Sequence, residues 1–166
     1  MRLFLAIQLS PAVREALLTA QADLRRQGRG SFPPPENLHL TLAFLGETAD
    51  LPGARAALNA AACRPFTLAV GGTLGHFGDL WWARVRGDPA LEDLALSLQA
   101  DLRARGFRLE DRPFRPHITL VRRWRGEASQ VTVPHASMVV RRISLLRSDL
   151  TDGKRIYTEL SHISLR

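Results

Sequence analysis

The tetrapeptide His39-Leu40-Thr41-Leu42 returns in the second half of the chain as His117-Ile118-Thr119-Leu120. The pentapeptide Gln21-Ala22-Asp23-Leu24-Arg25 recurs unchanged as Gln99-Ala100-Asp101-Leu102-Arg103, and the separation between its two copies equals that between His39 and His117. We call this separation the repeat offset. A single match of this length could arise by chance, but two matches in one register indicate an internal duplication. The fold is therefore predicted to contain two similar halves.

Each half follows the same order of a strand, a helix and a second strand. Ser10 and Asp88 are residue types that favour helix N-caps. Each is followed by a proline, which fits the first helical turn. Apolar residues then recur at helical spacing until Gly28 and Gly106, which favour helix ends. The predicted strands that flank the two helices are residues 2–9 and 38–45 in the first half, and 81–86 and 117–121 in the second.

The remaining chain completes the predicted architecture. Residues 53–62 look helical, and residues 131–140, which include Pro134, look like loop and strand. Further strands are predicted at 67–70, 143–146 and 156–165, and their short, partly alternating runs favour antiparallel sheets with one covered face. We predict an α+β fold with a pseudo-two-fold duplication: two mainly antiparallel sheets, helices on the outer faces and a central cleft. Residues 1–166 are expected to form a single domain of two intertwined lobes.

The composition narrows the class of partner and the cell compartment. The formal net charge is +7, and nearly all of the basic residues are arginine, which favours a polyanionic partner such as RNA or a nucleotide. Codon bias towards arginine would explain the same excess. Cys63 is the only cysteine, so no intramolecular disulfide and no cysteine cluster for zinc can form. No apolar run reaches the roughly 20 residues of a membrane helix, so we expect no membrane contact and a cytoplasmic monomer.

The duplicated tetrapeptide carries residues suited to acid–base chemistry. Alternation along a strand places His39 and Thr41 on one face, and His117 and Thr119 on one face of the other strand. We expect each half to bury its leucines or isoleucine under its own helix and to turn the imidazole and hydroxyl towards the cleft. Imidazole titrates near pH 6.5, so one ring can accept a proton while the other donates one. The threonine hydroxyls can donate hydrogen bonds to phosphate oxygens, and no cofactor or metal is predicted.

These motifs and their flanks resemble those of the 2H phosphoesterases, which are named for their two histidines. Within that group the chain is similar to the bacterial and archaeal RNA 2′,3′-cyclic phosphodiesterases, also called 2′–5′ RNA ligase-like proteins. The blocks that carry the resemblance are residues 2–7, 37–46 and 112–120. The resemblance implies a bilobal fold with a central cleft. It also implies metal-independent hydrolysis of terminal 2′,3′-cyclic phosphates on RNA to 2′-phosphates, and a weak reverse 2′–5′ ligation.

The resemblance also implies roles for individual residues. His39, His117, Thr41 and Thr119 are expected to be catalytic, with His39 as the acid and His117 as the base, although two nearly identical motifs do not by themselves orient the pair. Arg122 and Arg115 are expected to bind substrate. Arg122 matches a basic position that follows the second motif in the family, but strict alternation would place it on the face opposite His117.

Two other functions fit the same residues. The first is hydrolysis of a small cyclic nucleotide or an ADP-ribose cyclic phosphate. The second is a non-catalytic protein that binds RNA ends. Retention of both histidines and both threonines favours an enzyme over a binding protein.

Overall fold

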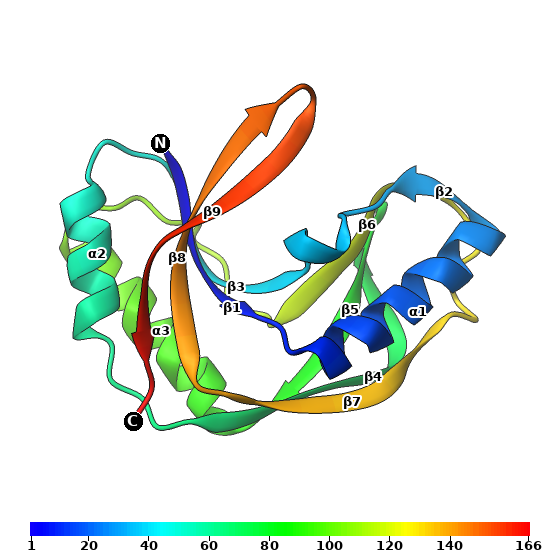
Figure 1. The fold of residues 1–166 in the computed structure, drawn as a ribbon, viewed down its shortest axis with the longest axis horizontal. Helices are drawn as coiled ribbons and strands as arrows, with labels where there is room; N and C mark the ends of the chain where they lie inside the picture. The colour runs from blue at the N-terminus through cyan, green and yellow to red at the C-terminus, as the bar shows by residue number, and fades with distance from the viewer.

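The computed structural model describes residues 1–166 as two antiparallel sheets and three α-helices (Figure 1). The first sheet has the strand order β3-β1-β8-β9, with strands His39–Glu47, Arg2–Gln8, Arg142–Thr151 and Lys154–Ser164. The second sheet has the order β2-β6-β5-β4-β7, with strands Gly28–Ser31, His117–Gly126, Leu80–Gly87, Phe66–Phe77 and Thr132–Val140. The predicted α+β class with two antiparallel sheets is confirmed.

The two long helices begin where their caps predict. Helix α1 spans Pro11–Gln27, and the Ser10 hydroxyl accepts a hydrogen bond from the Val13 amide. Helix α3 spans Pro89–Ala104, and the Asp88 carboxylate accepts from the Ala90 amide. A shorter helix, α2 (Leu51–Ala60), and a 3-10 turn, η1 (Pro35–Asn37), complete the helical elements. None of these helices is both long enough and apolar enough to cross a bilayer.

The duplication is visible in the pairing of the strands. Strand β1 pairs with β3 in the first sheet, and β5 pairs with β6 in the second. Beyond these pairs the sheets also match in position, because β8 and then β9 extend the first sheet from β1 as β4 and then β7 extend the second from β5. Strand β2, at the edge of the second sheet, has no counterpart. Each histidine motif therefore begins the strand that pairs with the first strand of its own half.

The helices do not stay with their own halves, and this corrects the prediction that each half is covered by its own helix. Helix α1, from the first half, packs mainly against β7 and also contacts β6, whereas α3, from the second half, reaches β3 (Figure 1). The repeated glutamines also form hydrogen bonds with the half to which they do not belong. Gln21 donates to the Leu120 carbonyl at 3.0 Å, and Gln99 donates to the Leu42 carbonyl at 2.9 Å.

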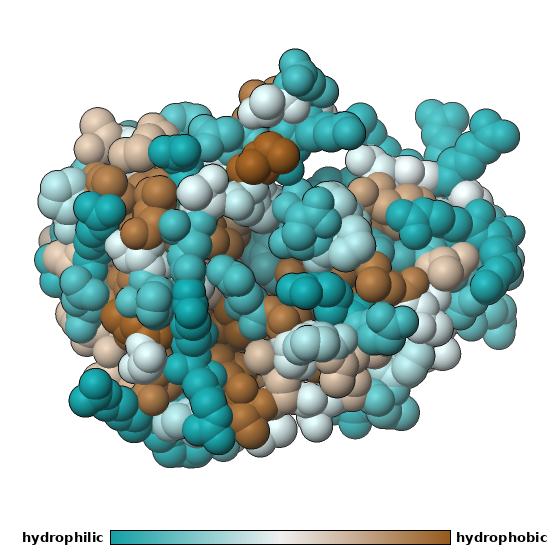
Figure 2. Space-filling view, viewed as in Figure 1, coloured by the Kyte–Doolittle hydropathy of each residue, from teal (hydrophilic) through white to brown (hydrophobic).

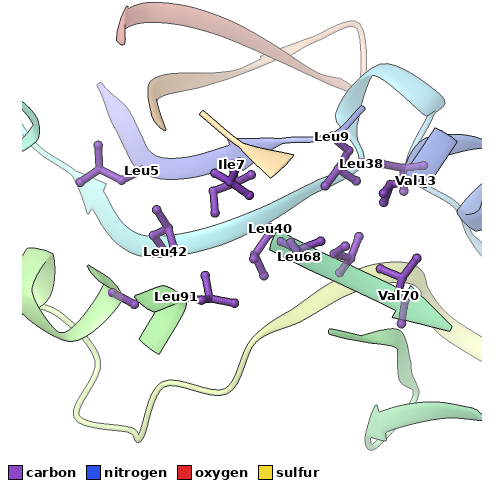
Figure 3. Packing of buried hydrophobic residues seen from close by; sticks show 14 of the residues in the cluster. Leu5, Ile7, Leu9, Val13, Leu38, Leu40, Leu42, Leu68, Val70 and Leu91 are labelled. Atoms are coloured by element: carbon purple, nitrogen blue, oxygen red, sulfur yellow. The ribbon is translucent and has the colours of Figure 1, made fainter. Parts of the chain in front are cut away.

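One continuous apolar core results from this exchange. It contains 39 buried residues drawn from both sheets and all three helices. Figure 3 shows Leu40 and Leu42 of β3 between the side chains of β1 and those of Leu68 on β4 and Leu91 on α3. Burial of this shared core stabilises the arrangement of the two sheets, because separating them would expose apolar surface on both.

Candidate active site

His39 begins β3 with both ring nitrogens engaged. Its Nδ1 lies 2.7 Å from the carbonyl oxygen of Asn37, and its Nε2 lies 2.9 Å from the Thr41 hydroxyl. A carbonyl oxygen can only accept a hydrogen bond, so Nδ1 carries the proton and donates. Nε2 is therefore the nitrogen that can gain or lose a proton.

His117 repeats this arrangement at the start of β6. Its Nδ1 lies 2.7 Å from the carbonyl oxygen of Arg115, which corresponds to Asn37 at the repeat offset. The same tautomer follows, with Nε2 again available for proton transfer. His117 and Thr119 are both half-buried, but no hydrogen bond joins them. The Nε2 atom of His117 thus has no protein partner, in contrast to that of His39.

Aromatic rings hold each imidazole in place. The centroid of the His39 ring lies 4.9 Å from that of Phe4 and 5.4 Å from that of Tyr157. The His117 ring has the same kind of neighbours, with centroids 5.7 Å away for Trp82 and 5.4 Å away for Phe77. Phe4 and Trp82 are themselves equivalent positions of the repeat. The duplication therefore places an aromatic side chain beside each histidine. This pair of aromatic residues could have been found from the repeat offset, although it lies outside the two tetrapeptides.

The two motifs come together where the sheets meet. Strands β3 and β6 belong to different sheets, yet their Cα atoms approach within 8 Å. Burial lowers the pKa of His39, and the positive charges of Arg122 and His117 lower it further. The hydrogen bond to the Asn37 carbonyl opposes this shift. His39 is therefore biased towards the neutral form in the unliganded protein.

A cleft of about 1000 Å³ opens from His39 and Thr41. Figure 2 shows the molecule hollowed beside the β8–β9 hairpin, with mostly hydrophilic side chains around the opening. Of the residues predicted for the site, His39, Thr41 and Arg122 line this cleft, whereas His117, Thr119 and Arg115 do not.

Arg122 reaches the cleft because β6 contains a bulge. Trp82 pairs with Thr119 and Trp81 with Val121, so Leu120 has no partner on β5. The extra residue shifts the alternation by one position. Arg122 therefore lies on the same side as Thr119, and the placement expected from strict alternation is wrong. The Leu120 carbonyl at this bulge is the one that Gln21 binds.

Arg115 has a different environment. Its side chain is exposed, and its guanidinium carbon lies 5.8 Å from the centroid of Phe77, the ring that also packs on His117. Its backbone carbonyl, rather than its charge, makes the contact with the histidine.

The structure contains no group of three or more His, Cys, Asp and Glu side chains arranged to hold a metal ion. The motifs carry two imidazoles and two hydroxyls, and His117 and Arg122 lie near enough to His39 for their charges to lower its pKa. Such a set can transfer two protons and stabilise negative charge on oxygen.

A family model described as the 2′-5′ RNA ligase superfamily matches residues 9–152. The chain belongs to the 2′-5′ RNA ligase superfamily. The predicted resemblance to the 2H phosphoesterases is thereby confirmed.

Several members of the superfamily are similar over most of this chain. A relative from Thermus thermophilus named RNA 2′,3′-cyclic phosphodiesterase is 37% identical over an alignment of 188 positions, which covers 100% of this chain and 91% of the relative. A relative of the same name from Geobacillus stearothermophilus is 36% identical over 140 residues and 75% of this chain, but this chain spans only 43% of its length. The crystal structure of E. coli LigT complexed with 3′-AMP superposes with a TM-score of 0.83 at 30% identity, covering 99% of this chain and 97% of LigT.

Part of the cleft of this superfamily member is not predicted by its motifs. Phe44, Lys154 and Arg155 line it, and none of them lies in a repeated motif. The repeat offset pairs Phe44 with Arg122, so the two halves differ at the position that follows each bulge. The hairpin residues had no local signal, since a strand pattern does not indicate which surface a turn will approach.

Proposed function

We propose that this chain hydrolyses terminal 2′,3′-cyclic phosphates on RNA to 2′-phosphates by two-histidine acid–base catalysis that requires no metal. The observation that carries the proposal is the equivalent tethering of two imidazoles by the Asn37 and Arg115 carbonyls, which leaves both Nε2 atoms able to exchange protons. Relatives from two bacteria are named RNA 2′,3′-cyclic phosphodiesterase, and E. coli LigT was crystallised with 3′-AMP.

The proposed reaction balances with these groups alone. The Nε2 of His117 takes a proton from water as the water oxygen bonds to phosphorus. The bond from phosphorus to the 3′ oxygen breaks, and the protonated Nε2 of His39 gives its proton to that oxygen. Each positioned transfer typically contributes about 10² to 10⁴ in rate.

The threonines fit the charge that develops on phosphate. In the unliganded protein the Thr41 hydroxyl donates to the neutral Nε2 of His39. Once Nε2 carries the proton that it gives to the leaving oxygen, it no longer accepts, and the Thr41 hydroxyl is free to donate to a non-bridging phosphate oxygen. Thr119 would do the same beside His117, and the Arg122 guanidinium would add a cation.

We assign the acid to His39 because the cleft that would hold the ribose opens from His39 and not from His117. The leaving 3′ oxygen belongs to that ribose. The lowered pKa of His39 favours its neutral form before substrate binds. A bound phosphodiester adds a negative charge, which raises the pKa of a neighbouring imidazole and supports its protonation.

Microscopic reversibility extends the proposal to weak 2′–5′ ligation, with a 5′-hydroxyl in place of water and the two histidines in exchanged roles. We expect hydrolysis to dominate, because water is far more concentrated than RNA ends. The predictions of a monomer and of a cytoplasmic location stay predictions, to be tested by sedimentation and by cell fractionation.

The test is incubation of the protein, with EDTA, with a short RNA that ends in a 2′,3′-cyclic phosphate, followed by phosphorus NMR. We expect a 2′-phosphate product that is lost in His39→Ala and in His117→Ala. His135→Ala, an exposed histidine on β7 outside the cleft, is the matched control and should keep the activity. Ring opening that survives both substitutions, or tight binding without opening by the wild type, would contradict the proposal.

A sulfur substitution tests the two roles separately. A cyclic substrate with sulfur in place of the 3′ oxygen has a leaving group that departs without protonation. We expect this substrate to restore turnover to His39→Ala but not to His117→Ala. Rescue of His117→Ala alone would reverse the assignment.

A further inference from the structure

We infer that the surface beside His117 binds the group that attacks phosphorus, and that it selects a nucleoside with a free 5′-hydroxyl and a 3′-phosphate over water. This inference rests on the proposed function, because the position of the attacking group follows from the roles of the two histidines. The surface comprises Phe77, Arg84 and Arg115, and we call it the His117 surface. None of its residues lines the cleft that opens from His39.

The direction of attack places the incoming group beside His117. The attacking and leaving oxygens of a phosphoryl transfer lie roughly in line, on opposite sides of phosphorus. The leaving 3′ oxygen is assigned to His39, because the cleft for the ribose opens there. The incoming oxygen therefore approaches from the His117 side, where a second nucleoside would lie apart from the first.

Polar groups around His117 lack partners within the protein. The Nε2 atom of His117 makes no hydrogen bond, whereas Nε2 of His39 is bonded to the Thr41 hydroxyl. The indole nitrogen of Trp82, the cross-strand partner of Thr119, also has no acceptor. Native proteins leave few such groups unsatisfied. The His117 side thus retains more hydrogen-bonding capacity for a ligand than the His39 side does.

An aromatic ring stands edge-on to each histidine. Tyr157 does so at His39, with ring centroids 5.4 Å apart and ring planes at 84°, and it lines the cleft. Phe77, at the end of β4, does so at His117, with a separation of 5.4 Å and an angle of 86°. Phe77 is 39% exposed, and exposed aromatic rings bind nucleobases by stacking. The base of the incoming nucleoside is therefore assigned to Phe77.

Two arginines flank this ring, and no carboxylate neutralises them. Arg84 is the cross-strand partner of His117, so the Cβ atoms of the pair lie about 4.5–5.5 Å apart on one face of the sheet. The guanidinium carbon of Arg115 lies 5.8 Å from the centroid of Phe77. Both arginines are exposed and neither forms an ion pair, although six other arginines do. A guanidinium binds phosphate through two parallel donors, which suits the 3′-phosphate of the incoming nucleoside.

Hydrolysis alone does not account for the His117 surface. A water molecule needs only Nε2 of His117, and it gains nothing from an aromatic ring or from two cations. A nucleoside 3′-phosphate uses all three features, since its base stacks on the ring, its 5′-hydroxyl reaches Nε2 and its phosphate meets the arginines. If the arginines served solubility alone, they would not influence which group attacks.

The transfer balances with the groups already assigned. The 5′ oxygen of the incoming nucleoside bonds to phosphorus as its proton passes to Nε2 of His117. The bond from phosphorus to the 3′ oxygen of the cyclic end breaks, and that oxygen takes the proton of Nε2 of His39. The product is a 2′–5′ linkage. The His117 surface thus sets the proportion of cyclic ends that pass to a nucleoside and not to water.

The test measures the choice between water and an added alcohol. A short RNA with a 2′,3′-cyclic end is incubated with adenosine 3′-phosphate, with adenosine or with methanol, which offers a hydroxyl alone. The transfer ratio is the amount of transfer product for each hydrolysis product at one alcohol concentration. Both products come from the same active molecules, so this ratio does not depend on the fraction of protein that folds.

Two variants of the His117 surface have matched controls. Phe77→Leu keeps an apolar side chain but removes the flat ring, and its control is Phe44→Leu, at a residue of similar exposure on the cleft that opens from His39. The charge variant and its control each lower the formal net charge of +7 by two, and the control changes exposed arginines outside the cleft and without ion pairs. They are Arg84→Gln with Arg115→Gln, and Arg108→Gln with Arg141→Gln.

We expect a wild-type transfer ratio about 100-fold higher for adenosine 3′-phosphate than for methanol. Phe77→Leu should lower the ratio about 10-fold for both nucleosides, because both lose the stacking. The charge variant should lower it about 10-fold for adenosine 3′-phosphate and leave adenosine unchanged, because only the former carries a phosphate. Both controls should keep the wild-type ratios.

Two outcomes would overturn the inference while leaving hydrolysis intact. One is an equal transfer ratio for methanol and adenosine 3′-phosphate in the wild type. The other is the same loss in the controls as in the variants of the His117 surface. If the wild type opens the cyclic end neither with water nor with an alcohol, the proposed function itself fails, and this inference fails with it.

Discussion

Replacing Gln21 with methionine should destabilise the protein and disturb the second histidine motif. The Gln21 side chain is 1% exposed and donates to two carbonyls, those of Leu120 and Pro33, at 3.0 and 3.2 Å. Methionine has a similar shape but no donor, so both acceptors lose their partner. A stranded buried acceptor costs about 1–3 kcal/mol, and burying an apolar side chain returns about 1 kcal/mol. With two acceptors stranded, we expect a net loss of about 1–5 kcal/mol.

Gln99→Met offers a comparison within the duplication. Gln99 is only half-buried and makes a single bond, to Leu42, so we expect a loss of about 1–2 kcal/mol. Gln27→Met, an exposed position on the same helix as Gln21, should change stability by less than about 0.5 kcal/mol. At about 2–4 °C for each kcal/mol, Gln21→Met should lower Tm by roughly 2–20 °C.

The assay is thermal and urea unfolding of the three variants, with kcat/KM on a cyclic-ended RNA. Since Leu120 lies between Thr119 and Arg122, loss of its hydrogen bond should also lower kcat/KM by about tenfold below the unfolding transition. Equal unfolding temperatures for Gln21→Met and Gln27→Met would show that the two carbonyls do not need the Gln21 donor. The hydrogen bonds of Gln21 would then contribute nothing measurable to the stability of the fold.

The lowered pKa of His39, the position of Arg122 and the hydrogen bond from the Asn37 side chain to the Arg155 carbonyl each predict a measurable effect. The pKa of His39 is lowered in the folded protein, so the stability that this group contributes is present above its unfolded pKa of about 6.5 and is lost as pH falls through its folded pKa. The free energy of unfolding, measured with urea from pH 8 to 5, should therefore decline, and His39→Gln should reduce that decline. The same pH profile in His39→Gln would contradict this prediction. Arg122→Gln should reduce kcat/KM about 10- to 100-fold, whereas Arg125→Gln, outside the cleft on the same strand, should not; equal losses would exclude a local role for Arg122. Asn37→Ala should speed tryptic cleavage after Arg155 by releasing the hairpin, and unchanged digestion would show that the tether is not needed.

Elements with local signals were predicted well. The caps at Ser10 and Asp88 and the apolar spacing located α1 and α3, because capping and helical periodicity depend on residues close in sequence. The repeat located both motif strands. Strand β4 was predicted only at residues 67–70 but runs from Phe66 to Phe77, and β2, with the sequence Gly-Arg-Gly-Ser, was missed. These stretches are strands because β5, β6 and β7 supply their hydrogen bonds, not because of propensity.

The residues of the site likewise divide into those with a local sequence signal and those without one. The two histidines and two threonines were predicted from their repetition, and so was their common orientation on each strand. The bulge at Leu120 was not, and it decides that Arg122 lines the cleft. A bulge is set by the pairing register with β5 and by the hydrogen bond from Gln21, both of which join residues far apart in the chain.

The duplication, the principal helices, the α+β class and the pair of His-x-Thr motifs can all be predicted from the sequence, since each is encoded by neighbouring residues or by direct repetition. Three other features depend on the packing of the whole chain: α1 covers the opposite sheet, β3 and β6 lie together, and Arg122, Arg123, Lys154 and Arg155 share one cleft. Burial of a common core selects among ways of packing the same elements. That selection involves contacts between residues distant in the chain, and no local pattern records them.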